Sequence, residues 1–215
     1  EKIPVNKKED EKLKCEPDPA WTKEEKEEYL GLNRKIPYGL KNGQPAKPSD
    51  WGIELKDTKE LETKWKEIAK GAKTATEAAS KKRAWISESA DWCGPDMRRQ
   101  IGNSRKDTDS FLNCIQAARK NGAPNDPKKR TNAQCMDFAA LLIALLRKEG
   151  VAARLVMGYN INGDQSDWHV WVEMWDCNEK DQAKKWKTLD ATSDNNPNNG
   201  KRNDMERDQD PIAPT

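Results

Sequence analysis

Apolar residues are distributed unevenly along this chain. They concentrate between about 135 and 192, whereas the first thirty and the last twenty-three residues are almost entirely polar. Runs that mix lysine with glutamate, at 7–14 and 23–28, are typical of solvated surface. The pattern therefore predicts one organised core with polar extensions on both sides.

The longest apolar segment predicts a buried central helix over 135–149. It is apolar on nearly every face, which is typical of a helix enclosed by other elements. Basic residues fall in its last turn, and Gly150 follows as a stop signal. Thr131 or Asn132 is available to cap its start.

Three short segments after this helix predict strands, at Ala152–Tyr159, Trp168–Asp176 and Lys185–Ala191. Short antiparallel strands packed on a helix make an α+β arrangement. Earlier in the chain, helical spacing of apolar residues predicts helices over 23–30, from Asp57 to Ile86 with a break near Gly71, and over 108–120.

Local signals refine the N-terminal half. Thr22 and Glu25 form the capping box of the first predicted helix. Recurring glycine and proline predict a loop over 31–51, and similar signals predict loops over 91–106 and 121–131.

Composition and charge exclude some classes of partner. Thirty-nine basic and 37 acidic side chains give a net charge of +2, so no strong field favours nucleic acid. The longest apolar run is half of the roughly 18 residues that a membrane span needs. The start without a methionine indicates a processed or excised piece, which leaves room for a removed signal or anchor.

Three residues have the chemistry of a thiol acyl-transfer site. Cys135 opens the central helix, His169 is the only histidine of the chain, and Asp190 ends the third predicted strand. They supply a nucleophile, a base and a group that fixes the tautomer of the base. A helix N-terminus also stabilises a thiolate. Taken singly, a cysteine or histidine in such a setting is more often an ordinary core residue.

Strand parity links the base with the carboxylate. His169 alternates with two tryptophans and Glu173 on one face of its strand, and Asp190 shares a face with Trp186. If the two strands form a hairpin in which opposed residue numbers sum to 359, His169 faces Asp190 directly. Directly opposed Cβ atoms lie about 5 Å apart, close enough for a carboxylate to bind the imidazole.

Four ordered blocks resemble the transglutaminase-like superfamily: Gln134 to Arg147, Gly150 to Tyr159, Trp168 to Trp175, and Trp186 to Thr192. They match its cysteine at the start of the core helix, its Arg and Gly-Tyr strand, its His-x-Trp-x-Glu strand and its Asp-x-Thr end. The resemblance implies a papain-like, transglutaminase-type α+β core, in which the helix with the cysteine packs on an antiparallel sheet, with a mainly helical N-terminal extension. It also implies a triad of Cys135, His169 and Asp190.

The chain departs from the family pattern near the nucleophile. Ala133 stands where many members have glycine, and Met136 where many have an aromatic residue. The upstream aromatic residue that assists the oxyanion in many members has Trp92 as a candidate, with an ordinary core tryptophan as the alternative. Calcium-dependent members exist, but the chain has no Asp-x-Asp-x-Asp-Gly loop, so we expect no cofactor and no essential metal.

The resemblance implies an enzyme that forms a thioester with a protein or peptide amide and passes the acyl group to an amine or to water. A glutamine or another amide is the expected donor, and lysine or a small amine the candidate acceptor. The alternatives are a cysteine peptidase or amidase that only hydrolyses, and a catalytically silent interaction module. Trp168, Trp171 and Trp175 either shield the thioester from water or belong to the core.

Composition and the resemblance together divide the chain into three parts. Residues 1–56 are predicted to be a polar arm and loop, 57–192 the transglutaminase-like catalytic domain with its motif block at 131–192, and 193–215 a polar, flexible tail.

Four cysteines remain if Cys135 is the nucleophile: Cys15, Cys93, Cys114 and Cys177. They allow two disulfides in three connectivities, and their spacing argues against a structural zinc site. Disulfides would indicate a secreted, periplasmic or surface protein. Free thiols in a reducing cell are the alternative.

Overall fold

The computed structural model describes residues 15–37, 40–41, 44–45, 52–92, 106–160, 168–192 and 205–207. Its helices are α2 (Lys23–Leu30), α3 (Lys59–Ala69), α4 (Ala75–Ser87), α6 (Thr108–Lys120) and α7 (Cys135–Lys148), with short 3-10 turns at η3 (Pro127–Lys129) and η4 (Gln182–Lys184). The predicted helices over 23–30 and 108–120 are confirmed.

The strands among the described residues form four small sheets. The largest is antiparallel, in the order β10 (Met205–Arg207), β7 (Ala153–Asn160), β8 (Trp168–Trp175) and β9 (Trp186–Leu189). The two-stranded sheets pair β1 (Arg34–Pro37) with β4 (Gly52–Leu55), β2 (Leu40–Lys41) with β3 (Gln44–Pro45), and β5 (Ala90–Trp92) with β6 (Thr131–Ala133). The chain is thus a mixed α+β protein, as predicted.

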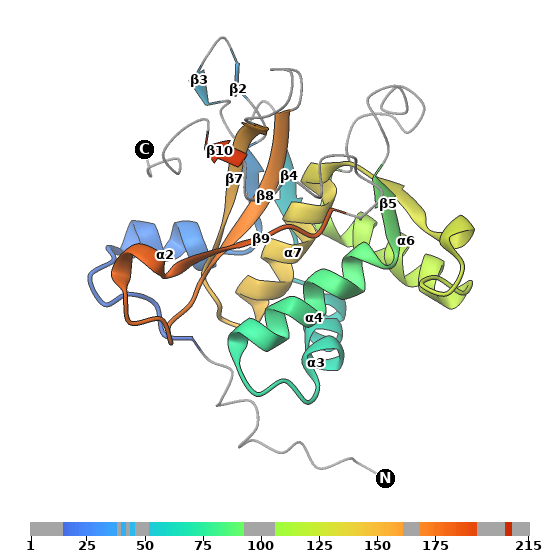
Figure 1. Ribbon diagram of the computed structural model, residues 1–215, viewed down its shortest axis with the longest axis horizontal. Helices are drawn as coiled ribbons and strands as arrows, with labels where there is room; N and C mark the ends of the chain where they lie inside the picture. Colours follow the sequence, from blue (N-terminus) through green and yellow to red (C-terminus); the bar gives the residue numbers. More distant parts are fainter. Residues whose placement is uncertain are drawn as a thin grey trace.

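Helix α7 lies at the centre of the molecule (Figure 1). It packs against β7 and β8 of the large sheet and against α3, α4 and α6. Every side chain from Phe138 to Leu146 is almost completely buried, because the segment is apolar on all faces and is enclosed on all sides. Gly150, with a φ of +88°, ends the helix in a conformation that glycine adopts without strain.

The long helix predicted from Asp57 to Ile86 is two helices. Gly71 has a φ of +76° and turns the chain between α3 and α4. The two helices pack against each other and against α7. At the predicted break near this glycine, the first helix therefore ends, and the chain turns into a second helix.

The predicted loop over 31–51 is wrong for β1, β2 and β3. Arg34–Pro37 pairs with Gly52–Leu55, and the side chains of Ile36, Ile53 and Leu55 are buried. Strand β4 packs on α6 and α7. The apolar pattern of each strand is too short to identify it, and the pairing joins residues far apart in sequence.

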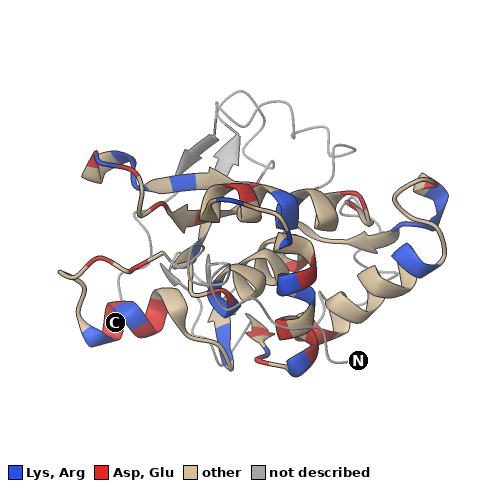
Figure 2. Cartoon of the chain, turned by 90° about the horizontal axis from the view of Figure 1, so that it is seen from below, with Lys and Arg blue, Asp and Glu red and all other residues tan. Residues whose placement is uncertain are grey.

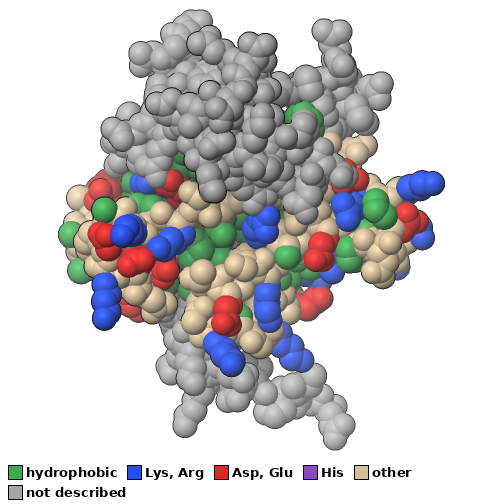
Figure 3. All heavy atoms as spheres, in the orientation of Figure 1, with side chains coloured by type: hydrophobic (Ala, Val, Ile, Leu, Met, Phe, Trp, Pro, Cys, Tyr) green, Lys and Arg blue, Asp and Glu red, His purple; other side chains and the backbone are tan. Residues whose placement is uncertain are grey.

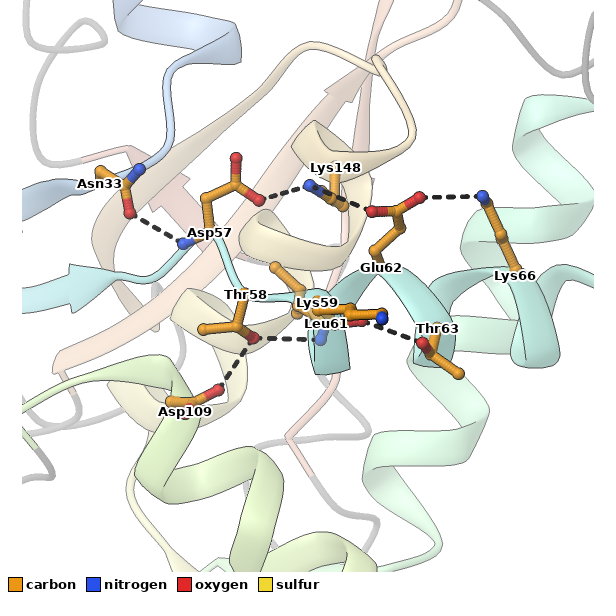
Figure 4. A network of polar contacts seen from close by, with 10 residues as sticks. All are labelled: Asn33, Asp57, Thr58, Lys59, Leu61, Glu62, Thr63, Lys66, Asp109 and Lys148. Atoms are coloured by element: carbon orange, nitrogen blue, oxygen red, sulfur yellow. Dashed lines mark hydrogen bonds and ion pairs between the residues drawn. The ribbon is translucent and has the colours of Figure 1, made fainter.

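A polar network fastens the start of α3 to two other helices (Figure 4). The Thr58 hydroxyl caps α3 and donates to Asp109 Oδ1 on α6 at 3.1 Å. Lys148, at the end of α7, pairs with Asp57 and lies 3.9 Å from Glu62. The two contacts of Lys148 fix the end of α7 that lies farthest from Cys135.

The segment in front of α2 is attached to the large sheet. Cys15 forms a disulfide with Cys177, just after β8. Beside it four aromatic rings pack with centroids 4.8–5.8 Å apart: Trp21, Tyr29, Trp175 and Trp186. Of the other cysteines, Cys114 is a free, partly exposed thiol, and Cys93 lies outside the described residues.

The predicted tail over 193–215 is described only at Met205–Arg207, which form β10 beside β7. The rest of the tail and residues 1–14 lie outside the described residues.

Charged side chains of both signs are scattered over the helices and over the face in Figure 3. Lys and Arg stand among Asp and Glu along most helices (Figure 2). Within the described ranges, no helix is both long enough and apolar enough to cross a bilayer.

Candidate active site

Cys135 is the first residue of α7, and its side chain is only 2% exposed. Strand β6 leads directly into the helix, and Gln134 is the N-cap residue. The Gln134 N–H donates to Asp137 Oδ2 at 2.9 Å, which fixes the first turn. The prediction that Thr131 or Asn132 caps this helix is wrong, because both residues lie in β6.

His169 and Asp190 are in direct contact. His169 Nε2 lies 2.9 Å from Asp190 Oδ2, and the two residues are 5% and 4% exposed. The Cys135 thiol interacts with the same imidazole. Because Nε2 faces the carboxylate, Nδ1 is the ring nitrogen left to serve the thiol. All three predicted site residues thus lie together.

The strand register differs from the predicted one by two residues. Opposed residues of β8 and β9 sum to 361, with Trp175 opposite Trp186 and Val172 opposite Leu189. A shift of two keeps every side chain on its face, so His169 and Asp190 still meet. The packing of Trp175 against Trp186, at 5.4 Å between ring centroids, accompanies this register.

Asp190 lies just beyond the last paired residue of β9 and is held by other contacts. Its Oδ1 accepts the Thr192 N–H at 2.8 Å. Its backbone carbonyl accepts a hydrogen bond from Arg83 Nε, on α4, at 2.6 Å. Arg83 did not emerge from the sequence, since 107 positions separate it from Asp190 and no local motif marks it.

The environment of His169 favours its protonated form. Burial disfavours the imidazolium, but hydrogen bonds to Asp190 and Cys135 and the negative charges of these groups outweigh it. Together they raise the pKa of His169 to about 9. At neutral pH the ring is therefore a cation between a carboxylate and the candidate nucleophile.

The tryptophans of β8 divide between two environments. The Trp171 ring stacks beside His169, with centroids 6.4 Å apart. Trp175 belongs to the aromatic cluster with Trp21, so it packs in the core of the N-terminal attachment. The Trp168 side chain lies outside the described part.

An ion pair crosses the same sheet. Arg154 on β7 binds Glu173 on β8 at 2.8 Å, and its guanidinium lies 3.9 Å from the centroid of Trp186. This pair ties the strand that carries His169 to its neighbour and to the aromatic cluster.

Trp92 lies on the strand that adjoins the start of α7. Strand β5 pairs in parallel with β6, and Trp92 is opposite Ala133, two residues before Cys135. Its side chain is partly buried against the core. This position keeps Trp92 a candidate for assisting the oxyanion. Among the side chains that the structure describes, no cluster of three or more His, Cys, Asp or Glu could hold a metal ion.

Comparison with known proteins places the chain in a family. The Transglutaminase-like superfamily matches residues 63–191, more than half of the chain. A search among curated proteins gives no match.

The chain is also similar to several solved structures. A candidate cysteine protease from Cytophaga hutchinsonii has a TM-score of 0.45 at 19% identity, with 68% of this chain and 40% of that one covered. The periplasmic domain of TgpA from Pseudomonas aeruginosa has a TM-score of 0.42 at 18% identity, with 65% and 44% covered. Red sea bream transglutaminase has a TM-score of 0.47 at 15% identity, with 79% and 32% covered. The chain spans less than half the length of each of these structures.

Proposed function

Because this chain belongs to the transglutaminase-like superfamily, we propose that it is a thiol enzyme that forms a thioester with a protein or peptide amide and passes the acyl group to an amine or to water. The 2.9 Å contact between His169 and Asp190, beside a cysteine at a helix N-terminus, supports this proposal most directly. We assign the chemistry to residues 57–192, with Cys135, His169 and Asp190 as the catalytic residues.

The first half of the reaction cleaves the amide. Cys135 Sγ attacks the amide carbonyl carbon, and the C–N bond breaks as His169 gives its proton to the leaving amine. The products are a thioester on Cys135 and a free amine. Asp190 keeps Nε2 of His169 in place and stabilises the imidazolium.

The second half transfers the acyl group. His169, now neutral, takes a proton from an incoming amine or water, which attacks the thioester and releases the Cys135 thiolate. Transfer to an amine makes a new amide, and transfer to water makes a carboxylic acid. Trp171, stacked beside His169, is placed to limit water at this step and so to favour an amine acceptor.

We assign the developing oxyanion to the backbone N–H groups in the first turn of α7. These groups lie at the positive end of the helix dipole. Trp92, on the strand beside β6, is the candidate for a second donor.

The disulfide between Cys15 and Cys177 supports an oxidising compartment. We therefore propose that the protein acts in a secreted, periplasmic or surface setting, on protein or peptide substrates and without a resident cofactor.

Alkylation tests whether the site is active. With iodoacetamide near pH 6, Cys135 in the full chain should react faster than Cys135 in the denatured protein, because the imidazolium of His169 and the helix N-terminus activate the thiol as a nucleophile. His169→Ala should slow the reaction. Equal rates in the native and denatured protein would show that the site is silent and would leave an interaction module.

An assay with a glutamine-containing protein and a labelled primary amine distinguishes acyl transfer from hydrolysis. Incorporation of the label, absent in Cys135→Ala, supports the transferase. Ammonia or peptide fragments without incorporation, also dependent on Cys135, support an amidase or peptidase.

A further inference from the structure

We propose that Arg83 is a positioning residue of the candidate triad, which holds Asp190 so that its carboxylate stays aligned with His169. The inference rests on the proposed function, since it assigns Arg83 a part in the same site. Arg83 does not touch the reacting atoms, and it acts through Asp190.

The contacts of Asp190 show how Arg83 acts on it. The regular pairing of β8 with β9 ends at Leu189, one residue before Asp190. Arg83 Nε donates to this carbonyl at 2.6 Å. The carboxylate of the same residue accepts the Thr192 N–H through Oδ1 and contacts His169 through Oδ2. The guanidinium therefore fixes the backbone from which the carboxylate projects.

Helix α4 holds Arg83 in a fixed position. The preceding residue, Lys82, is fully buried and pairs with Glu149 at the end of α7. Helix α4 packs on α7, and α7 carries Cys135. Arg83 thus connects the helices that place the nucleophile with the residue that orients the base.

The form of the side chain matters for this role. Guanidinium is planar and rigid, and it presents its Nε–H in a fixed direction, whereas a lysine ammonium is a compact charge on a flexible stem. Arg83→Lys therefore keeps the charge but loses the directed bond, and Arg83→Gln loses both.

The test is the pH dependence of Cys135 alkylation in the full chain, followed by mass spectrometry of the Cys135 peptide so that other thiols do not contribute. In the described residues, Asp190 and Cys135 are the titratable groups that act on His169. A less constrained Asp190 stabilises the imidazolium less, so the Cys135 thiol loses part of the partner that activates it. In Arg83→Gln we expect the alkylation rate at pH 6 to fall by about tenfold.

Two further variants show whether Arg83 acts through Asp190. Asp190→Asn should slow alkylation, and adding Arg83→Gln to it should slow the reaction no further. Lys81→Met is the matched control, because Lys81 is exposed on the same helix and donates to the Lys70 carbonyl. It should leave the pH profile of the wild type unchanged.

The outcomes are distinct. Slow alkylation of the wild type would contradict the proposed function itself. Fast wild-type alkylation with an unchanged profile in Arg83→Gln, or an effect that adds fully to that of Asp190→Asn, would overturn the role of Arg83. If Arg83→Gln does not fold, Arg83→Lys decides the question: a shifted profile at unchanged Tm supports positioning, and a wild-type profile refutes it.

Discussion

At the scale of single residues, the candidate site is an arrangement of charges that are removed from water. His169 is buried between Asp190 and Cys135, and these two groups raise its pKa to about 9. An isolated histidine at the same depth would lose its proton more easily, because burial disfavours the cation. The partners therefore determine the protonation state of the ring.

This raised pKa predicts how stability depends on pH. The contribution of His169 is fully present below about pH 6.5, the pKa of the unfolded chain, and is lost as pH rises through about 9. Relative to His169→Gln, the wild type should lose about 3 kcal/mol of unfolding free energy between about pH 6 and pH 9.5. Urea denaturation at both pH values measures it. A constant difference between the two proteins would contradict the raised pKa.

At the scale of elements, local sequence signals define some of the helices, whereas tertiary contacts define some of the strands. The Thr22 capping box forms as predicted, with Glu25 Oε2 accepting the Thr22 N–H at 2.7 Å. The apolar run of α7 and its glycine stop also suffice to define that helix. By contrast, β1 and β4 depend on their pairing with each other, and β4 also packs on α6 and α7. In the same way, the register of β8 and β9 accompanies the packing of Trp175 against Trp186.

The start of α3 offers a prediction for one element. Thr58→Ala removes both the cap of α3 and the hydrogen bond to Asp109. We expect it to lower the unfolding free energy by about 1–2 kcal/mol, measured by urea denaturation. Thr63→Ala is the control, since its exposed hydroxyl donates only to the Lys59 carbonyl inside the helix. It should change stability by less than about 0.5 kcal/mol. Equal effects of the two substitutions would refute a capping role.

At the scale of the whole molecule, the described N-terminal segment is part of the fold. The disulfide joins residues 162 positions apart, and the aromatic cluster packs α2 beside the sheet that carries His169. Buried Arg147, near the end of α7, donates to the Gly31 carbonyl at 2.8 Å and so connects this segment to the central helix. The segment therefore stabilises the sheet through the disulfide and the aromatic cluster.

Loss of this covalent link should destabilise the protein strongly. Cys15→Ser with Cys177→Ser should lower the unfolding free energy by about 4 kcal/mol, because a long closed loop restricts the unfolded chain. The corresponding fall in Tm is roughly 10 °C. Cys114→Ser, which changes a free thiol, is the control and should shift Tm by less than about 2 °C. If a reducing agent leaves the Tm of the wild type unchanged, the disulfide does not stabilise the fold.

The sequence by itself determined the elements whose signals are local and the residue types of the candidate site. Continuous apolarity marked α7, short apolar segments after this helix marked β7 and β8, and scarcity marked His169 as the only possible base. Parity also paired His169 with Asp190, because a register shift of two leaves faces unchanged. Only the tertiary structure decided which contacts hold these groups. Arg83 reaches Asp190 across 107 positions, and Cys15 reaches Cys177 across 162. Such contacts depend on how packed helices and strands meet, and no local pattern encodes them.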